Sequence, residues 1–224
     1  MFSDADRAFM AENMKIVVES IESKLREPVC SEFASIAVDL ISKSIDSIIK
    51  FEASGVARDL YTFHDNEAEE FINRHFCEIE KTIKNEDVKQ MLDALRHSFA
   101  CYAYNGLHQL YTRQENECWH PKIELTEILQ PNDIESLPDY MTLYRGCDIV
   151  EFEEKAFGQA WTTSLEIARK FAYSHYSNQE WFHKKNRVVL GTKFSKKNVL
   201  FSDQSREYEV VIDVAKLMDV RVCE

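Results

Sequence analysis

Glycine and proline are scarce in this chain of 224 residues, which has five of the first and four of the second. Because both residues interrupt helices, their scarcity favours long helices. The six cysteines form no CxxC pair and show no regular spacing, which argues against a disulfide framework or a zinc site and indicates free thiols. No apolar run reaches the roughly 20 residues of a membrane span, and the first residues lack the regions of a secretion signal. We therefore expect a cytoplasmic protein.

Positive charge is also in short supply. Lysine and arginine total 27 against 39 acidic residues, a net charge of −12 that argues against a general nucleic-acid-binding protein. The imbalance is concentrated in residues 1–120, which hold 22 acidic and 13 basic side chains, whereas residues 121–224 hold 17 and 14. The C-terminal part is therefore nearly balanced, and its cations are available to meet an anion.

Apolar residues recur at helical spacing in the first 115 residues, in segments near 10–25, 33–48, 68–83 and 88–102. From about residue 137 the pattern changes to short β-prone runs: TLYRG, GQAWTT, RVVLGTKF, NVLF and EYEVVIDV. One helix interrupts them, SLEIARKFAYSHY, with Ser164 as its expected N-cap. Helices first and strands later predict an α+β fold.

Three short pieces within the β-prone part carry candidate chemistry. Each piece alone is common, because a strand arginine, a threonine pair and an acidic pair all occur on ordinary solvated strands. Together they occur in a fixed order along the chain. The pieces are Tyr144-Arg145-Gly146, Trp161-Thr162-Thr163 and Glu207-Tyr208-Glu209.

In this order the pieces resemble the Arg–Ser/Thr–Glu signature of the ADP-ribosyltransferase family, and the stretch QAWTTSLEIARKFA is similar to its bacterial, toxin-like mono-ADP-ribosyltransferases. The resemblance implies a compact, mostly antiparallel β-sandwich core behind a helical N-terminal layer. We accordingly expect an N-terminal helical region over residues 1–60 and a transferase domain over 61–224. That domain divides into a helical layer, 61–136, and a β-rich catalytic core, 137–224.

The resemblance implies that NAD is the substrate and that no metal takes part. Breaking the nicotinamide–ribose bond creates an oxocarbenium-like ribose, which needs a fixed negative charge that we assign to Glu209. Glu207 is expected to accept a proton from the incoming nucleophile. Arg145 is expected to grip the two phosphates, because a guanidinium binds phosphate in a bidentate manner.

The remaining site residues are expected to shape the NAD pocket. Gly146 would allow close approach of the nucleotide. A threonine hydroxyl would hold the Glu209 side chain, with either Thr162 or Thr163 in the position of the family's serine. The same resemblance assigns the pocket three aromatic residues, and three more are candidates for stacking on nicotinamide or the acceptor. The first three are Tyr144, Trp161 and Phe171, and the others are Tyr173, Tyr176 and Trp181.

The acceptor of the ADP-ribose is left open between a protein and a nucleic acid. The resemblance implies that glutamate at position 207 favours a protein arginine. Residues 183–200 hold six basic and no acidic residues, which favours an RNA or DNA base. An intracellular enzyme of this kind is typical of toxin–antitoxin and phage-defence systems, with a neutralising antitoxin protein expected to contact residues 1–60. Two alternatives stay open: an NAD glycohydrolase, and a catalytically inactive interaction module.

Overall fold

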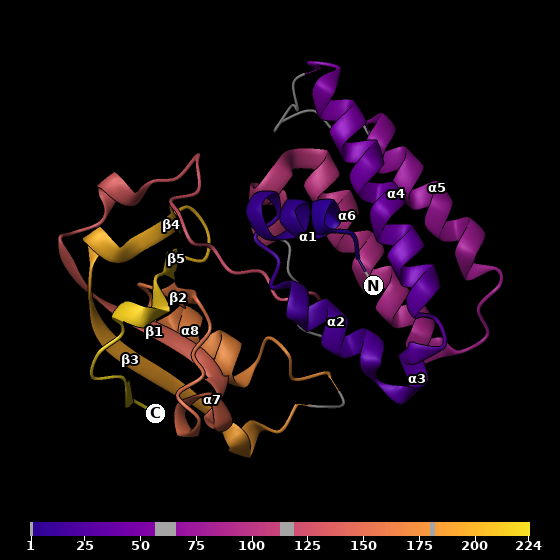
Figure 1. Ribbon diagram of the computed structural model, residues 1–224. Helices are drawn as coiled ribbons and strands as arrows, with labels where there is room; N and C mark the ends of the chain where they lie inside the picture. The colour runs from indigo at the N-terminus through magenta and orange to yellow at the C-terminus, as the bar shows by residue number, and fades with distance from the viewer. Residues whose placement is uncertain (1, 57–65, 113–118, 180–181) are drawn as a thin grey trace. The chain divides into compact units, whose positions relative to one another are not determined.

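The computed structural model describes residues 2–56, 66–112, 119–179 and 182–224 (Figure 1). Its contacts divide the chain into two compact units, Met1–Glu124 and Leu125–Glu224. Helices dominate the first unit and antiparallel strands the second, which confirms the expected α+β class. The boundaries expected at residues 60 and 136 concern functional roles, which a division by contacts does not test, and they stay predictions.

The N-terminal unit is built around three helices, α4, α5 and α6, of which α4 and α5 run alongside each other in Figure 1. Aliphatic side chains at helical spacing, such as Ile41, Ile45 and Ile48 on α4, are fully buried between them. Within the ranges that the structure describes, no helix combines the length and hydropathy needed to cross a membrane. The helices of this unit are α1 (Asp4–Ala8), η1 (Phe9–Asn13), α2 (Val18–Arg26), α3 (Pro28–Ser31), α4 (Ala34–Ala53), α5 (Glu67–Glu80) and α6 (Glu86–Thr112).

Local residues account for two of the helix ends, and one expected helix is interrupted. Helix α4 stops just before Gly55, whose φ of +70° suits a residue without a side chain. Asn85 caps α6 through its side-chain oxygen, which accepts from the Val88 amide at 3.2 Å. The segment expected to be one helix over residues 10–25 breaks at Lys15, which has a φ of 55°, and Ile16 pairs instead with Ile123. About 100 residues separate Ile16 from Ile123 in the sequence, so local periodicity could not reveal their pairing.

The C-terminal unit carries one six-stranded antiparallel sheet in the order β4-β5-β2-β1-β3-β6. All five strand segments expected from the sequence appear, and the sheet gains a short final strand, β6. Because these strands share a single sheet, the expected sandwich and transferase core stay predictions. The strands are β1 (Tyr140–Asp148), β2 (Ala160–Thr162), β3 (Arg187–Ser195), β4 (Val199–Asp203), β5 (Glu209–Ile212) and β6 (Arg221–Val222). The helices of this unit are η2 (Ile134–Ser136), α7 (Ile149–Glu153), α8 (Leu165–Tyr173), η3 (Lys184–Asn186), η4 (Lys196–Asn198) and η5 (Val214–Lys216).

The two faces of this sheet are covered differently. Helix α8 packs on one face, where its Ala168 and Ala172 bury Val189 and contact Tyr144. The opposite face carries the larger apolar cluster. Because side chains alternate along a strand, each residue of β1 points either toward α8 or toward this larger cluster. The buried members of the larger cluster are Ile134, Leu137, Met141, Leu143, Cys147, Trp161, Leu190, Phe194, Val199, Val210 and Ile212.

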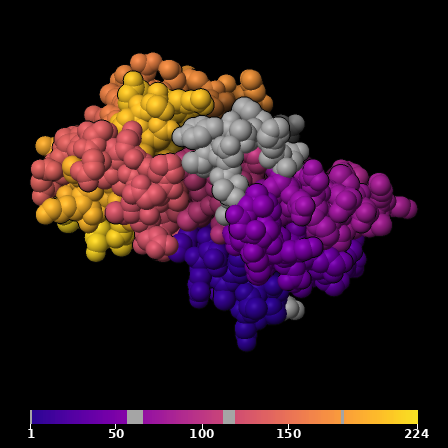
Figure 2. All heavy atoms as spheres, turned by 90° about the horizontal axis from the view of Figure 1, so that it is seen from above, coloured from indigo at the N-terminus to yellow at the C-terminus, as the bar shows by residue number. Residues whose placement is uncertain are grey.

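The outer edges of the sheet are covered by irregular chain and by the C-terminus. The Leu129 amide donates to the Leu200 carbonyl at 2.8 Å, and the Asp133 amide donates to the Ser202 carbonyl at 3.1 Å, so residues 129–133 run along β4. In Figure 2 the yellow atoms of the last strands are bordered by the salmon-coloured atoms of the segment that follows residue 125. Strand β6 pairs with part of β3 at the other edge. These contacts pair part of the backbone at each edge of the sheet.

Candidate functional site

The three motif pieces lie on three neighbouring strands, β1, β2 and β5, although up to 65 residues separate them in sequence. Tyr144 pairs with Thr162, and Thr162 pairs with Glu209. On the far side of Glu209 the next partner is Asp203 of β4. Directly paired residues point to the same face, so these four side chains form one row across the sheet. The row defines the candidate site and lies on the face that α8 covers.

Glu209 is a half-buried carboxylate among like charges. Its pKa is raised from 4.5 to about 7, first by burial and then by the negative charges of Glu207 and Asp203. Its carboxylate makes no hydrogen bond or ion pair with any residue that the structure describes. A carboxylate that is buried, crowded by acids and left unpaired is stabilised by any cation that comes beside it.

The loop before Glu209 is fastened to β2 by its backbone. The Thr162 hydroxyl donates to the Glu207 carbonyl at 2.8 Å, and the Thr163 amide donates to the Tyr208 carbonyl at 3.0 Å. Tyr208 has a φ of 52°, an unusual value for a residue with a side chain. One of the threonines was expected to hold the Glu209 side chain, but the Thr162 hydroxyl holds the loop backbone and the Thr163 hydroxyl donates to the Gln204 side chain. Both threonines thus contribute to the attachment of this loop, and the position of the family's serine stays open between Thr162 and Thr163.

A glutamine that the sequence did not single out completes this network. The Gln204 side chain accepts from the Thr163 hydroxyl at 2.9 Å and donates to the Glu209 carbonyl at 3.1 Å. The backbone amide of Gln204 donates to the Asp133 carboxylate at 2.7 Å, and this bond ties the loop to the segment along β4. No local pattern marks Gln204 or Asp133, because their partners lie 41 and 71 residues away in sequence.

Arg145 lies on the other face of the sheet from Glu209. Its neighbours at i−2 and i+2, Leu143 and Cys147, belong to the apolar cluster opposite α8, and alternation places Arg145 with them. The guanidinium forms a bidentate pair with Glu151 of α7, at 2.8 and 3.0 Å, and donates to the Ala160 carbonyl at 2.6 Å. These contacts give Arg145 a structural task, to join β1, α7 and β2. The contact with NAD phosphates stays a prediction.

Gly146 is required by a helix. A β-carbon at this position would lie 2.1 Å from the Ala168 carbonyl oxygen and 2.4 Å from the Ala172 nitrogen, both backbone atoms of α8. Only glycine permits this approach. Gly146 thus lets α8 pack closely on the face that carries Tyr144 and Glu209, and its expected contact with a nucleotide stays a prediction.

The aromatic residues of the motifs have separate surroundings. Trp161 is 3% exposed, belongs to the apolar cluster opposite α8 and donates from its indole to the Gly158 carbonyl at 3.0 Å. Tyr144 is half-buried on the row of Glu209, next to α8. Phe171 is also half-buried, near the end of α8, with its ring centre 4.9 Å from that of His175. Trp181 lies outside the described residues.

The basic residues of segment 183–200 do not gather in one place. Lys184, Lys185 and Arg187 lie at the start of β3, next to the end of α8. Lys193, Lys196 and Lys197 lie toward the other end of this nine-residue strand, about 30 Å from the first group. Lys196 is also neutralised by Glu135 at 3.4 Å. The basic residues thus form two groups at opposite ends of β3, and contact of this segment with a phosphodiester backbone stays a prediction.

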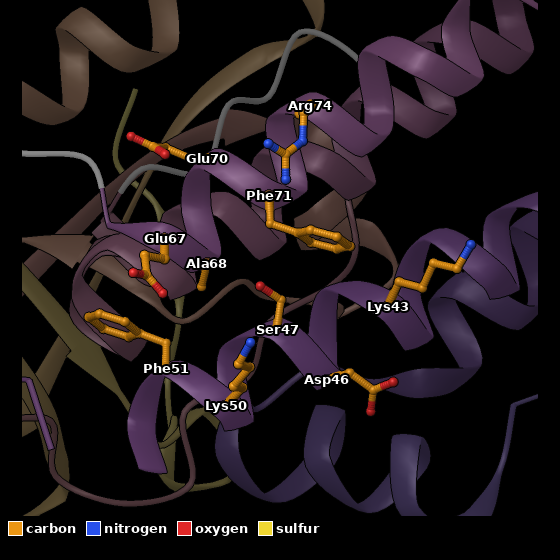
Figure 3. Close-up of a pocket in the computed structure, with 10 residues that line it drawn as sticks. All are labelled: Lys43, Asp46, Ser47, Lys50, Phe51, Glu67, Ala68, Glu70, Phe71 and Arg74. Carbon is orange, nitrogen blue, oxygen red and sulfur yellow. The ribbon is translucent and has the colours of Figure 1, made fainter. Parts of the chain in front are cut away.

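The described residues include no group of three or more His, Cys, Asp or Glu side chains arranged to hold a metal. A groove of about 540 Å³ lies between α4 and α5 in the N-terminal unit. Figure 3 shows Ser47 and Ala68 facing it from the two helices, with Phe71 reaching from α5 toward α4. Its three basic and three acidic side chains balance and favour no ligand class. The basic ones are Lys43, Lys50 and Arg74, and the acidic ones Asp46, Glu67 and Glu70.

Comparison with known proteins finds no family model that matches this chain, and no curated protein or solved structure that is similar to it. The resemblance to ADP-ribosyltransferases therefore depends on the three motif pieces of the sequence.

Proposed function

We propose that the C-terminal unit cleaves NAD at the nicotinamide–ribose bond and transfers the ADP-ribose to a macromolecular acceptor. The observation that carries this proposal is Glu209, a half-buried and unpaired carboxylate whose pKa is raised to about 7. It lies in one row with Tyr144 and Thr162, the other motif residues on that face. Such a carboxylate suits a reaction that develops positive charge on its substrate.

In this reaction the nicotinamide leaves with the electron pair of the broken C–N bond. Nicotinamide departs as a neutral molecule, so no general acid is needed. The ribose that remains is positively charged, and Glu209 stabilises it electrostatically. The acceptor then forms a new bond to the ribose carbon, and its proton passes to Glu207, which is exposed in the loop before β5.

The other motif residues either contact the substrate directly in this proposal or support the site indirectly. Tyr144 lies two strands from Glu209, about 10 Å along the row, which suits a contact with the nicotinamide ring. Thr162 and Thr163 hold the loop that carries both glutamates. Gly146, Trp161 and Phe171 shape the pocket indirectly, through α8 and the apolar cluster. Arg145 lies on the other face of the sheet, where its pair with Glu151 acts on the shape of the site, and its contact with the phosphates stays a prediction.

The biological part of the proposal is an intracellular toxin, of a toxin–antitoxin or phage-defence system, whose antitoxin contacts the acidic N-terminal helices. Growth on expression tests it. Wild-type protein without a partner gene should arrest growth, and Glu209→Gln should not. Equal growth of the two strains would contradict the toxin.

The decisive experiment for the activity is incubation with NAD labelled in its adenylate part and a cell extract, followed by separate protease and nuclease digestion. We expect label in a macromolecule with wild type and a loss of at least 10²-fold with Glu209→Gln, NAD binding being retained. Glu166→Gln is the matched control, because Glu166 is an exposed glutamate of α8 outside the row. Release of nicotinamide without a labelled macromolecule would show that the enzyme hydrolyses NAD and does not transfer ADP-ribose. NAD that stays intact would exclude both activities.

A further inference from the structure

The row of Glu209 continues past Tyr144 to the far edge of the sheet. Tyr144 pairs with Gly191 of β3, and Gly191 pairs with Arg221 of β6. Directly paired residues point to the same face, so the Arg221 side chain lies on the face of Glu209 and Tyr144. Four strand spacings, about 19 Å, separate the backbone of Arg221 from that of Glu209.

Lys193 is a second cation on this face. It follows Gly191 by two residues on β3 and pairs with Thr142 of β1. Val189, two residues before Gly191, packs against α8, so alternation along β3 places Lys193 on the α8 face as well. Lys193 is the diagonal neighbour of Arg221 across the β3–β6 pair, with the α-carbons about 7 to 8 Å apart. Two long side chains at this separation can contact one ligand group.

The two cations are exposed and available to an anion. Neither Arg221 nor Lys193 forms an ion pair with any residue that the structure describes. The motif arginine differs in both respects, because Arg145 lies on the opposite face and is bound by Glu151. The face that carries Glu209 therefore has its own pair of cations.

The cover that α8 gives to this face stops short of Lys193. Gly146 lies against the α8 backbone, and Tyr144 contacts the alanines of the helix. Tyr140 lies on the same face by alternation, but it is 77% exposed. Four strand residues, about 13 Å, separate Tyr144 from Tyr140, and the pair of Thr142 with Lys193 lies midway between them. We call this stretch of the face the open strip.

We infer that Lys193 and Arg221 bind the pyrophosphate of NAD and that Tyr140 stacks on its adenine, an inference that rests on the proposed function for the identity of the ligand. A guanidinium binds phosphate in a bidentate manner, and an ammonium adds a point charge beside it. An exposed tyrosine ring offers a face to a planar base. From Tyr144 to Tyr140 the open strip thus presents a ring, two cations and a second ring, the order of the complementary groups in a dinucleotide.

Titration calorimetry with ADP tests the site without catalysis, because ADP has no nicotinamide bond to cleave. Wild-type protein should bind ADP at least tenfold more tightly than adenosine, and the ADP affinity should fall as salt rises. Lys193→Gln with Arg221→Gln should weaken ADP binding about tenfold or more. Lys184→Gln with Lys185→Gln is the matched control, because it removes two exposed charges at the other end of β3. Equal losses in the two pairs of substitutions, or no binding of ADP by wild type, would overturn the inference.

Tyr140 is tested by comparing two ligands. Tyr140→Ala should weaken ADP binding about fivefold or more, because the stacking face is lost, and Tyr140→Phe should keep it. Inorganic pyrophosphate lacks the base, so it should bind Tyr140→Ala as it binds wild type. Equal affinity of Tyr140→Ala and wild type for ADP would contradict the placement of the adenine.

The Cys223 thiol reports on the occupied site by a second measurement. Cys223 follows Arg221 by two residues, and its sulfur lies 2.6 Å from where a β-carbon of Gly191 would be. Alkylation of this exposed thiol by iodoacetamide should slow when ADP is bound, whereas exposed Cys77 of α5 should react at an unchanged rate. The same rate at Cys223 with and without saturating ADP would count against the site.

NAD kinetics on the same variants separate this inference from the proposed function. Lys193→Gln with Arg221→Gln should raise the KM for NAD about tenfold or more and change kcat less, because the pyrophosphate does not react. NAD turnover with an unchanged KM would overturn the inference and leave the function standing. ADP binding that depends on the two cations, without NAD turnover by wild type, would retain the nucleotide site and refute the enzyme.

Discussion

Arg145 and Glu209, the arginine and the last glutamate of the motif pieces, lie on opposite faces of the same sheet. Only strand β2 lies between the strands that carry them, but alternation along β1 places the guanidinium on the face of Leu143 and Cys147. Glu209 belongs to the face of Tyr144 and α8. The pairing of Arg145 with Glu151 follows from this placement, because a cation among apolar groups needs a fixed anion.

Arg145 and Glu151 should behave as a pair in a double-mutant cycle. Arg145→Ala and Glu151→Ala should each lower the free energy of unfolding by about 2 kcal/mol, and the double variant by clearly less than the sum. If the guanidinium also binds NAD phosphates, Arg145→Ala alone should raise the KM for NAD, since Glu151→Ala keeps the guanidinium. Thermal denaturation and NAD kinetics measure both. Additive losses would contradict the pairing, and equal KM values would leave Arg145 with its structural task alone.

The pH dependence of turnover and of stability should report the raised pKa of Glu209. Because Glu209 must be ionised, kcat/KM should rise with pH and level off above about 7. The pKa in the unfolded chain is near 4.5, so the folded state binds more protons between 4.5 and 7, and the free energy of unfolding should fall over that window.

Glu209→Gln removes this pH-dependent term. It should therefore be more stable than wild type at pH 8, by at most about 3 kcal/mol, and equal to it near pH 4. Scanning calorimetry at the two values checks the sign. A variant less stable than wild type at pH 8 would contradict the raised pKa.

Glu207→Gln should separate the two halves of the reaction. Because Glu207 takes the proton of the acceptor, transfer should fall about tenfold or more while NAD hydrolysis falls less. Removing this neighbouring charge should also move the pH midpoint of hydrolysis below that of wild type, since Glu207 helps to raise the pKa of Glu209. Asp213→Asn, outside the row, is the control. An unchanged ratio of transfer to hydrolysis would remove Glu207 from the proton path.

Gly146→Ala should be strongly destabilising. The new methyl group would meet the backbone of α8 at 2.1 and 2.4 Å, and a helix backbone cannot move aside as a flexible side chain can. We expect a loss of about 3 kcal/mol or more in the free energy of unfolding. The control is Gly191→Ala, where the contact is the Cys223 thiol of the exposed C-terminus, for which about 1 kcal/mol or less is expected. Similar losses would contradict this account of Gly146.

Gln204→Leu should act on catalysis through the position of Glu209. The substitution removes the hydrogen bonds to Thr163 and to the Glu209 carbonyl, so the loop that carries both glutamates loses its anchor. We expect kcat to fall about 10-fold to 100-fold with the KM for NAD nearly unchanged. Thr192→Val, which removes a hydroxyl bonded to Met218 elsewhere in the sheet, is the control. A rise in KM with constant kcat would contradict a positioning role.

Local patterns in the sequence predicted most of the elements. Apolar spacing located α4, α5 and α6, and Ser164 caps α8 as expected, through its hydroxyl oxygen, which accepts from the Ile167 amide at 3.3 Å. Such features depend on neighbours within a few residues, which is why they are readable without coordinates. The prediction of one helix over residues 10–25 was wrong, because Ile16 pairs in a β-bridge with Ile123, which is distant in the sequence.

The sequence by itself determined the order of the motif pieces and the strands that carry them. Only the tertiary structure decided that Thr162 pairs with Glu209, that Glu207 and Asp203 raise the pKa of that carboxylate, and that Arg145 faces away from it. The physical reason is range. Helical periodicity and caps arise between near neighbours, whereas strand register, burial and the charge around one carboxylate are set by segments that meet only when the sheet forms.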